Sequence, residues 1–91
     1  MLHDEEFLAR LQKGNRVQIP VLVRWKHRLD AGEVLRVYIV NRKARRRGSF
    51  YARVGKDGRF TVPRIIVEEL EAEPGDVLSC TLHGPPSKEE E

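Results

Sequence analysis

The chain has 91 residues, of which 40% are apolar and 34% are charged, so its length supplies one domain with a small core. It carries 17 Lys and Arg against 14 Asp and Glu, and no apolar run approaches the roughly 18 residues of a membrane-spanning helix. One cysteine, Cys80, and three scattered histidines form neither an internal disulfide nor a four-ligand zinc site. The acidic start Met1–Glu6 is unlike a signal peptide, so we expect a cytoplasmic protein that folds without metal or cofactor.

The positive charge lies in the first half of the chain. Residues 1–47 carry 12 Lys and Arg against 5 Asp and Glu, whereas residues 48–91 carry 5 against 9, so the two parts have net charges of +7 and −4. Most of the cations are arginine, whose planar guanidinium matches the geometry of phosphate. This pattern favours a polyanion as partner, and the alternative is a solvated basic surface without one. Low counts of Asn, Gln, Met and Cys are also typical of heat-adapted proteins.

An internal repeat organises the chain. Residues 7–39 align with residues 50–82 at an offset of 43 without a gap, and nine of the 33 pairs are identical. The identical pairs are Phe7/Phe50, Ala9/Ala52, Arg10/Arg53, Lys13/Lys56, Arg16/Arg59, Pro20/Pro63, Gly32/Gly75, Val34/Val77 and Leu35/Leu78. Two copies are too few for a solenoid, so we predict a single domain over 1–91 made of two interlocked halves with approximate two-fold symmetry.

Each copy begins with a predicted hairpin. Alternating apolar residues indicate strands over 7–11 and 50–54, and tight turns follow at 13–16 and 56–59. The centres of these turns, Gly14-Asn15 and Asp57-Gly58, readily adopt positive φ angles. The returning strands, 16–19 and 59–62, each end at a proline that suits the first turn of a helix.

The two predicted helices, 21–29 and 64–71, differ in chemistry. In the first, helical spacing places Leu22, Trp25 and Leu29 in an inward stripe and leaves the cations nearer solvent; these cations are Arg24, Lys26 and Arg28. In the second, Ile66 and Leu70 point inward, and the exposed residues are Glu68, Glu69 and Glu71. The first helix therefore has a basic outer side and the second an acidic one.

Glycine turns and two polar segments complete the pattern. Each helix is predicted to end in a glycine turn, at Gly32 or Gly75, that leads into strand 34–40 or 77–82. Residues 41–48, with five cations and no large apolar side chain, predict an exposed basic linker loop. Residues 83–91 have the composition of a disordered tail.

The second copy resembles the AbrB/MazE/SpoVT family of small DNA-binding domains. The resemblance rests on Val54–Pro63, the apolar helix that follows, and Leu70–Val77 with its Pro74-Gly75-Asp76 turn. The first copy follows the same pattern more loosely, with Gly32-Glu33 in place of Gly-Asp. The resemblance implies a mainly β, pseudo-two-fold swapped-hairpin barrel of the cradle-loop type, built from two strand-strand-helix-strand repeats. A double-psi-like barrel is the alternative.

The resemblance also implies a transcription regulator that binds double-stranded DNA through turn arginines and helix cations. With the basic linker and the neighbouring cations of each copy, the predicted DNA-binding residues are Arg10, Lys13, Arg16, Arg24, Lys26, Arg42, Lys43, Arg45, Arg46, Arg47, Arg53, Lys56 and Arg59. We expect Arg24 and Lys26 to reinforce Arg16, and the acidic helix to oppose phosphate beside Arg59. Ion pairs of Arg16 and Arg59 with Glu33 or Asp76 are the alternative role for these side chains.

Other readings stay open. One alternative is an antitoxin of the MazE type. Another is a cradle-loop barrel that binds no DNA and instead binds protein, or a second copy of itself, through the acidic second helix. No enzyme activity and no small-molecule substrate are expected, because Cys80 and His83 fall on opposite faces of one strand. His27 is predicted to be a partly buried structural residue, and Trp25 a core anchor rather than a base-stacking side chain.

Overall fold

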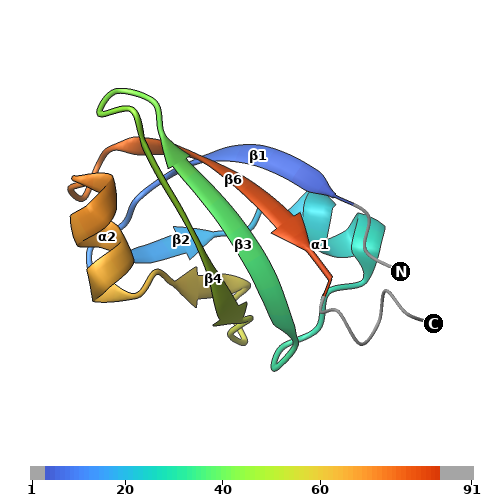
Figure 1. The fold of residues 1–91 in the computed structure, drawn as a ribbon. Helices are drawn as coiled ribbons and strands as arrows, with labels where there is room; N and C mark the ends of the chain where they lie inside the picture. Colours follow the sequence, from blue (N-terminus) through green and yellow to red (C-terminus); the bar gives the residue numbers. More distant parts are fainter. Residues whose placement is uncertain (1–3, 85–91) are drawn as a thin grey trace.

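A computed structural model describes residues 4–84, in which six strands and two helices follow one another in the repeated order (Figure 1). The first copy contributes β1 (Glu5–Arg10), β2 (Arg16–Gln18), α1 (Val21–His27) and β3 (Val34–Asn41). The second contributes β4 (Arg46–Arg53), β5 (Arg59–Thr61), α2 (Arg64–Leu70) and β6 (Val77–His83). The prediction of a mainly β fold with two short helices is confirmed. Most of the predicted tail, 85–91, lies outside the described residues, and its first residue ends β6.

Every ladder joins one copy of the repeat to the other. The larger sheet has the order β1-β6-β3-β4, and the smaller one pairs β2 with β5; all neighbours are antiparallel. Neither copy therefore builds a sheet from its own strands. The predicted hairpins within each copy are wrong, because β1 pairs with β6, β4 with β3, and β2 with β5. The described residues have a radius of gyration of 12.4 Å, and none of their helices is long and apolar enough to cross a membrane.

The two glycine turns are held by the end of a strand from the opposite copy. Gly75 N–H donates to Leu11 O at 2.7 Å, and the equivalent Gly32 N–H donates to Val54 O at 2.7 Å. Arg10 Nη1 donates to Gly75 O at 2.9 Å, and Arg53 Nη1 to Gly32 O at 3.0 Å. Both glycines have positive φ, 99° and 91°, which a side chain would strain. The contacts repeat at the offset of 43 residues seen in the sequence.

Residues with positive φ occur at the tight turns and at the helix ends. Gly14 and Asn15 both have positive φ, as predicted, but in the second turn only Gly58 does. The helices end one residue after His27 and Leu70, at Arg28 (φ 51°) and Glu71 (φ 53°). The predicted glycine turns follow these residues: Gly32 and Gly75 lie inside the turns 30–33 and 73–76 that lead into β3 and β6.

The inward face of α1 differs from the predicted stripe. Leu22 and Trp25 are 71% and 72% exposed, whereas Val23 and Leu29 pack against the core. The inward faces of α1 and α2 occupy equivalent positions, because Val23 and His27 correspond to Ile66 and Leu70. The prediction for α2 is confirmed, with Leu70 fully buried. In α1 it is wrong because a polar residue, His27, takes the place of the inward leucine, so the apolar residues alone indicated another face.

The predicted basic loop 41–48 is instead a β-hairpin. β3 continues to Asn41 and β4 begins at Arg46, which leaves a four-residue turn. Asn41 is 1% exposed and donates through Nδ2 to Leu70 O at 2.9 Å, and Gly48 lies under Ile66. β4 is an edge strand of the larger sheet, where long charged side chains reach water while the backbone still pairs on one side.

The phase of the helices is tested by two leucine truncations. Leu70→Ala removes a fully buried side chain from α2 and is expected to lower the free energy of unfolding by about 2–5 kcal/mol. Leu22→Ala, on the outward face of α1, is expected to change it by less than about 0.5 kcal/mol. Urea unfolding followed by circular dichroism measures both, and equal losses would contradict the observed phase.

Candidate nucleic-acid interface

The ribbon of β2 and β5 presents polar side chains outward and apolar ones inward. Val17 and Phe60 face the core, and Arg16 lies opposite Thr61 while Gln18 lies opposite Arg59. We call Arg16, Gln18, Arg59 and Thr61 the ribbon face. The antiparallel register places the turn with Lys13 at one end of the ribbon and the turn with Lys56 at the other. Three residue pairs at ~3.4 Å each make the ribbon roughly 10 Å long.

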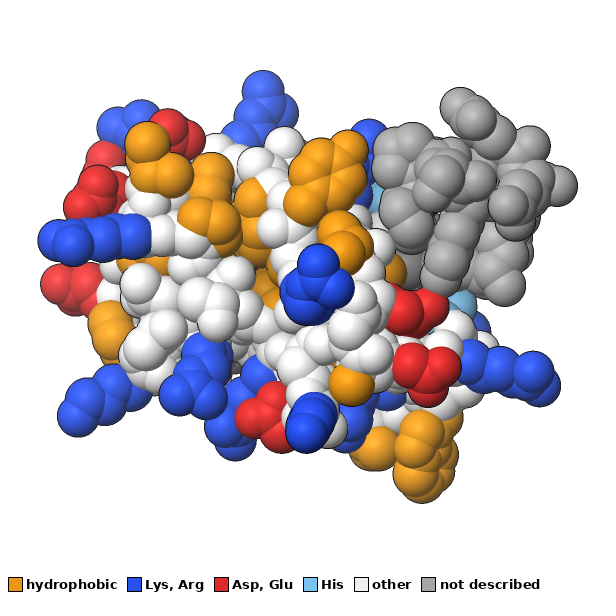
Figure 2. All heavy atoms as spheres, turned by 90° about the horizontal axis from the view of Figure 1, so that it is seen from below, with side chains coloured by type: hydrophobic (Ala, Val, Ile, Leu, Met, Phe, Trp, Pro, Cys, Tyr) orange, Lys and Arg blue, Asp and Glu red, His pale blue; other side chains and the backbone are white. Residues whose placement is uncertain are grey.

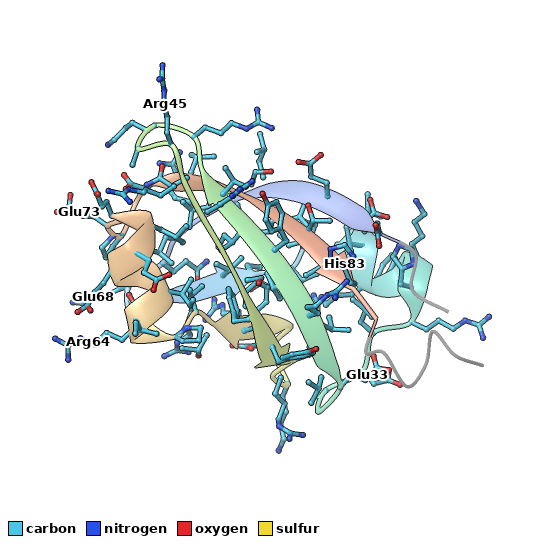
Figure 3. The ribbon with its side chains drawn as sticks, in the orientation of Figure 1. Glu33, Arg45, Arg64, Glu68, Glu73 and His83 are labelled. Carbon is cyan, nitrogen blue, oxygen red and sulfur yellow. The ribbon has the colours of Figure 1, made fainter. Side chains whose placement is uncertain are left out.

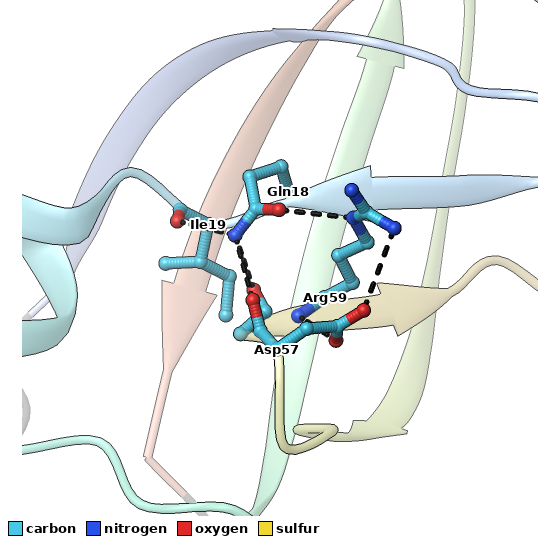
Figure 4. A network of polar contacts seen from close by, with 5 residues as sticks. Gln18, Ile19, Asp57 and Arg59 are labelled. Atoms are coloured by element: carbon cyan, nitrogen blue, oxygen red, sulfur yellow. Dashed lines mark hydrogen bonds and ion pairs between the residues drawn. The ribbon is translucent and has the colours of Figure 1, made fainter.

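A hydrogen-bonded network fixes the Arg59 end of the ribbon face (Figure 4). Arg59 Nε donates to Gln18 Oε1 at 3.0 Å, and Arg59 Nη1 lies 3.4 Å from Asp57 Oδ2. Gln18 Nε2 in turn donates to Asp57 O at 3.0 Å, which ties one copy's strand to the other copy's turn. Arg59 is therefore positioned, with part of its charge offset by Asp57. Arg16, its equivalent, makes no ion pair with any residue between 4 and 84.

Arg24 belongs to the Arg59 end of the ribbon rather than to Arg16. Its guanidinium lies so close to Gly58 that a Cβ there would sit 2.4 Å from Nη1, and its Nε is buried without a hydrogen-bond partner in the described residues. The expectation that Arg24 reinforces Arg16 is therefore wrong, because the helix of one copy packs on the turn of the other. The equivalent residue of α2 is Val67. Arg24 is also less exposed than its predicted position nearer solvent implies.

The cations of residues 42–47 lie at and beside the tip of the β3–β4 hairpin, apart from the ribbon face (Figure 1). Three of them pair with acids from other elements: Arg42 with Glu6 at 3.9 Å, Lys43 with Asp76 at 3.5 Å, and Arg46 with Glu71 at 2.8 Å. Arg45 projects away from the tip (Figure 3). Only Arg45 and Arg47 of this group lack an ion pair within residues 4–84.

Other predicted contact residues already serve intramolecular roles. Arg10 and Arg53 hold the glycine turns, and Lys26 pairs with Glu5 at 3.2 Å. Asp76 pairs with Lys43 and not with a turn arginine, and a hydrogen bond from Glu73 N–H holds the pKa of the Asp76 carboxyl below its ordinary value. Lys and Arg side chains project from several parts of the face seen from below, with acids between some of them (Figure 2). The structure thus divides the predicted set among the ribbon, the hairpin tip and structural contacts.

Gln18 is a ribbon-face residue that the sequence analysis missed. Its signal is the period of two in a strand: Gln18 stands two residues after Arg16 and so shares its face. Thr61 follows Arg59 in the same way. The cation pattern drew attention to the arginines and passed over the neutral side chains between them.

A contact between His27 and Glu5 joins α1 to β1 within the first copy. The His27 side chain is 6% exposed, and its Nε2 lies 2.8 Å from Glu5 Oε1. This hydrogen bond, with Lys26 nearby, holds the pKa of the Glu5 carboxyl below its ordinary value. His27 is thus the structural histidine that was predicted, whereas Trp25 is not the predicted core anchor.

The chain's thiol is enclosed. Cys80 is fully buried in β6, and burial raises its pKa to about 12. His83, three residues on, contacts Asp4, with Nδ1 and Oδ1 2.6 Å apart. Within residues 4–84 no group of three or more His, Cys, Asp or Glu is placed to hold a metal ion.

The structure is similar to the solution structure of PHS018 from Pyrococcus horikoshii, with a TM-score of 0.81 and 26% sequence identity. The likeness covers 87% of this chain and 88% of that one, so it extends over both copies of the repeat. The sequence matches no protein-family model and no curated protein.

The Glu5–His27 contact predicts a pH dependence of stability. Because the folded-state pKa of Glu5 is lowered, its contribution is present above the ordinary value of 4.5 and is lost as the pH falls through the folded-state pKa. Glu5→Gln should be less stable than the wild type near neutral pH and approach it in acid. Urea unfolding across this range, with the exposed Glu69→Gln as control, measures the difference. A constant gap at all pH values would contradict it.

Proposed function

We propose that the protein is a non-enzymatic DNA-binding protein, a transcription regulator that lays its β2–β5 ribbon face in the major groove of duplex DNA. The observation that carries the proposal is the ribbon face itself, with Arg16, Gln18 and Arg59 side by side on an outward surface. The major groove, about 12 Å wide, admits a two-stranded β-ribbon. Arginine and glutamine are the side chains that pair with the exposed edges of guanine and adenine.

The surroundings of the ribbon supply phosphate contacts. Lys13 and Lys56, at its two ends, make no ion pair with a described residue and so have their charge available for the backbone of the duplex. Arg24 adds a charge at the Arg59 end, held in place against Gly58. Arg45 of the hairpin tip and Arg47 of β4 lie to one side of the ribbon face. Contacts from them to phosphate would raise affinity for DNA without reading its sequence.

We further infer that the strands close into a pseudo-two-fold barrel of the cradle-loop type, of which the swapped-hairpin arrangement is the favoured form. Two features support this. Each ladder connects the two copies, and the contacts of each glycine turn recur at the offset of 43 residues. Such a body places its two turn arginines, Arg16 and Arg59, at positions related by the pseudo-two-fold axis, with only Arg59 held by Gln18 and Asp57.

DNA binding is expected to be strongly salt-dependent and to need the turn arginines. About five phosphate contacts give a slope of log affinity against log salt of about −4 to −5. The double variant Arg16→Ala/Arg59→Ala is expected to lower affinity at least about tenfold, because each arginine contact with a base edge contributes about 1–3 kcal/mol. Fluorescence anisotropy of a labelled duplex across a salt series measures both quantities.

The matched control is Arg36→Ala/Arg64→Ala, which removes the same charge from exposed positions on β3 and α2. Affinity should fall far less in this control than in the ribbon variant. Equal losses in the two variants would show that net charge and not the ribbon face governs binding. A wild-type protein that binds no duplex at low salt would exclude DNA as the partner.

A further inference from the structure

The outward faces of the two helices carry opposite charge at equivalent positions. Lys26 and Arg28 of the α1 segment correspond to Glu69 and Glu71 of the α2 segment, and Trp25 corresponds to Glu68. All of these residues are exposed. The inward faces of the two helices follow the same phase, so the outward faces are presented in the same way. The repeat has therefore kept the geometry of the helix and reversed the charge of its exposed side.

The α1 surface also carries exposed apolar side chains that no described residue covers. Val21, Leu22 and Trp25 are 44%, 71% and 72% exposed and stand on one side of a helix of only seven residues. Arg24 and Arg28 flank Trp25, and neither makes an ion pair within residues 4–84. An exposed aromatic residue with aliphatic neighbours and a cationic rim has the composition of a docking surface for an acidic partner.

The α2 surface has the complementary composition. Ile65 is 64% exposed and stands where Leu22 stands in α1. Glu68 pairs within the helix with Arg64 at 3.5 Å, and Glu71 pairs with Arg46, but both pairs are largely exposed and so are weakly held. Glu68 and Arg64 point away from the body (Figure 3). This face offers a small apolar centre with an acidic rim.

We propose that α1 of one copy of this chain docks on α2 of a second copy, head to tail. Burial of Trp25 and Leu22 against Ile65 supplies the attraction, and Lys26 and Arg28 against the acids of α2 set the orientation. Two α1 faces would bring cations together and two α2 faces would bring acids together, so only the unlike pair is favoured. The proposal does not rest on DNA binding.

The arrangement extends beyond a pair. α1 and α2 lie at opposite ends of the molecule (Figure 1), so a docked copy leaves its own α1 open to the next. A heterologous contact of this kind forms rings where the rotation closes and open chains where it does not. Each helix is roughly 10 Å long at ~1.5 Å per residue, so the contact is small and the association weak and concentration-dependent.

Sedimentation velocity of the full chain over a range of concentrations tests the proposal, with two charge-reversed variants. Lys26→Glu/Arg28→Glu makes both helices acidic, and Glu69→Lys/Glu71→Lys makes both basic. Each variant alone is expected to stay monomeric, and an equimolar mixture should associate again. Glutamate is accommodated at the left-handed position 28, since Glu71 occupies the equivalent place with φ 53°.

Trp25→Ala gives a test that leaves every charge in place. Because Trp25 is exposed, its loss should not affect folding, and it should weaken association at least about tenfold. The control Arg36→Glu, an exposed charge reversal on β3, should associate like the wild type. The proposal is overturned by a wild-type chain that stays monomeric at every concentration, by a mixture that does not associate, or by Trp25→Ala that lowers DNA affinity without changing association.

Discussion

Backbone hydrogen bonds between the two copies are the constraint on which the rest of the structure depends. The N–H of each left-handed glycine, Gly32 and Gly75, donates to a carbonyl at the end of the opposite copy's first strand, and an arginine of that strand closes the turn. The acceptors belong to Leu11 and Val54, which are 1% and 3% exposed, and a backbone group left unpaired in a buried position costs about 1–3 kcal/mol. The first strand of each copy therefore needs the glycine turn of the other, and the ribbon β2–β5 exists only where both copies are present.

Within this symmetric frame, a few substitutions make the halves different. Arg24 and His27 stand on the inward side of α1 where α2 has Val67 and Leu70. The Glu5 carboxylate accommodates His27 through a hydrogen bond. Gly58 accommodates Arg24, because the guanidinium occupies the place where a side chain at position 58 would lie. In α1 these two polar side chains thus point toward the body beside Val23 and Leu29, while Leu22 and Trp25 face solvent. α2 keeps the ordinary distribution, and this inversion gives the molecule one apolar, basic end and one acidic end.

The sequence analysis succeeded where local pattern and tertiary structure agree. Alternation predicted the strands, and the Gly-Asn pair predicted a turn with two positive φ angles. It failed for α1, where Leu22 and Trp25 follow helical spacing but lie outside. The repeat alignment predicts the observed inward face of α1, because it aligns Val23 and His27 with the inward Ile66 and Leu70.

The placement of charge was harder to predict than the fold. The five cations of residues 42–47 look unpaired in the sequence, yet Arg42, Lys43 and Arg46 meet acids from distant elements. The network of Gln18, Asp57 and Arg59 likewise depends on the register between β2 and β5, which no local pattern encodes. Arg16 and Arg59 are therefore far apart in sequence but lie on one face of the ribbon. The neighbouring cations of residues 42–47 differ from one another, because three pair with acids and two do not.

The central claim, that the ribbon face meets duplex DNA, is tested most directly by titrating the ¹⁵N-labelled chain with a short duplex and following its amide signals. The account predicts that the largest shifts fall on residues 13–18 and 56–61, with smaller ones near Arg24, while the amides of Glu68 and Glu69 stay unchanged. Shifts confined to the β3–β4 tip, or no shifts at low salt, would contradict it.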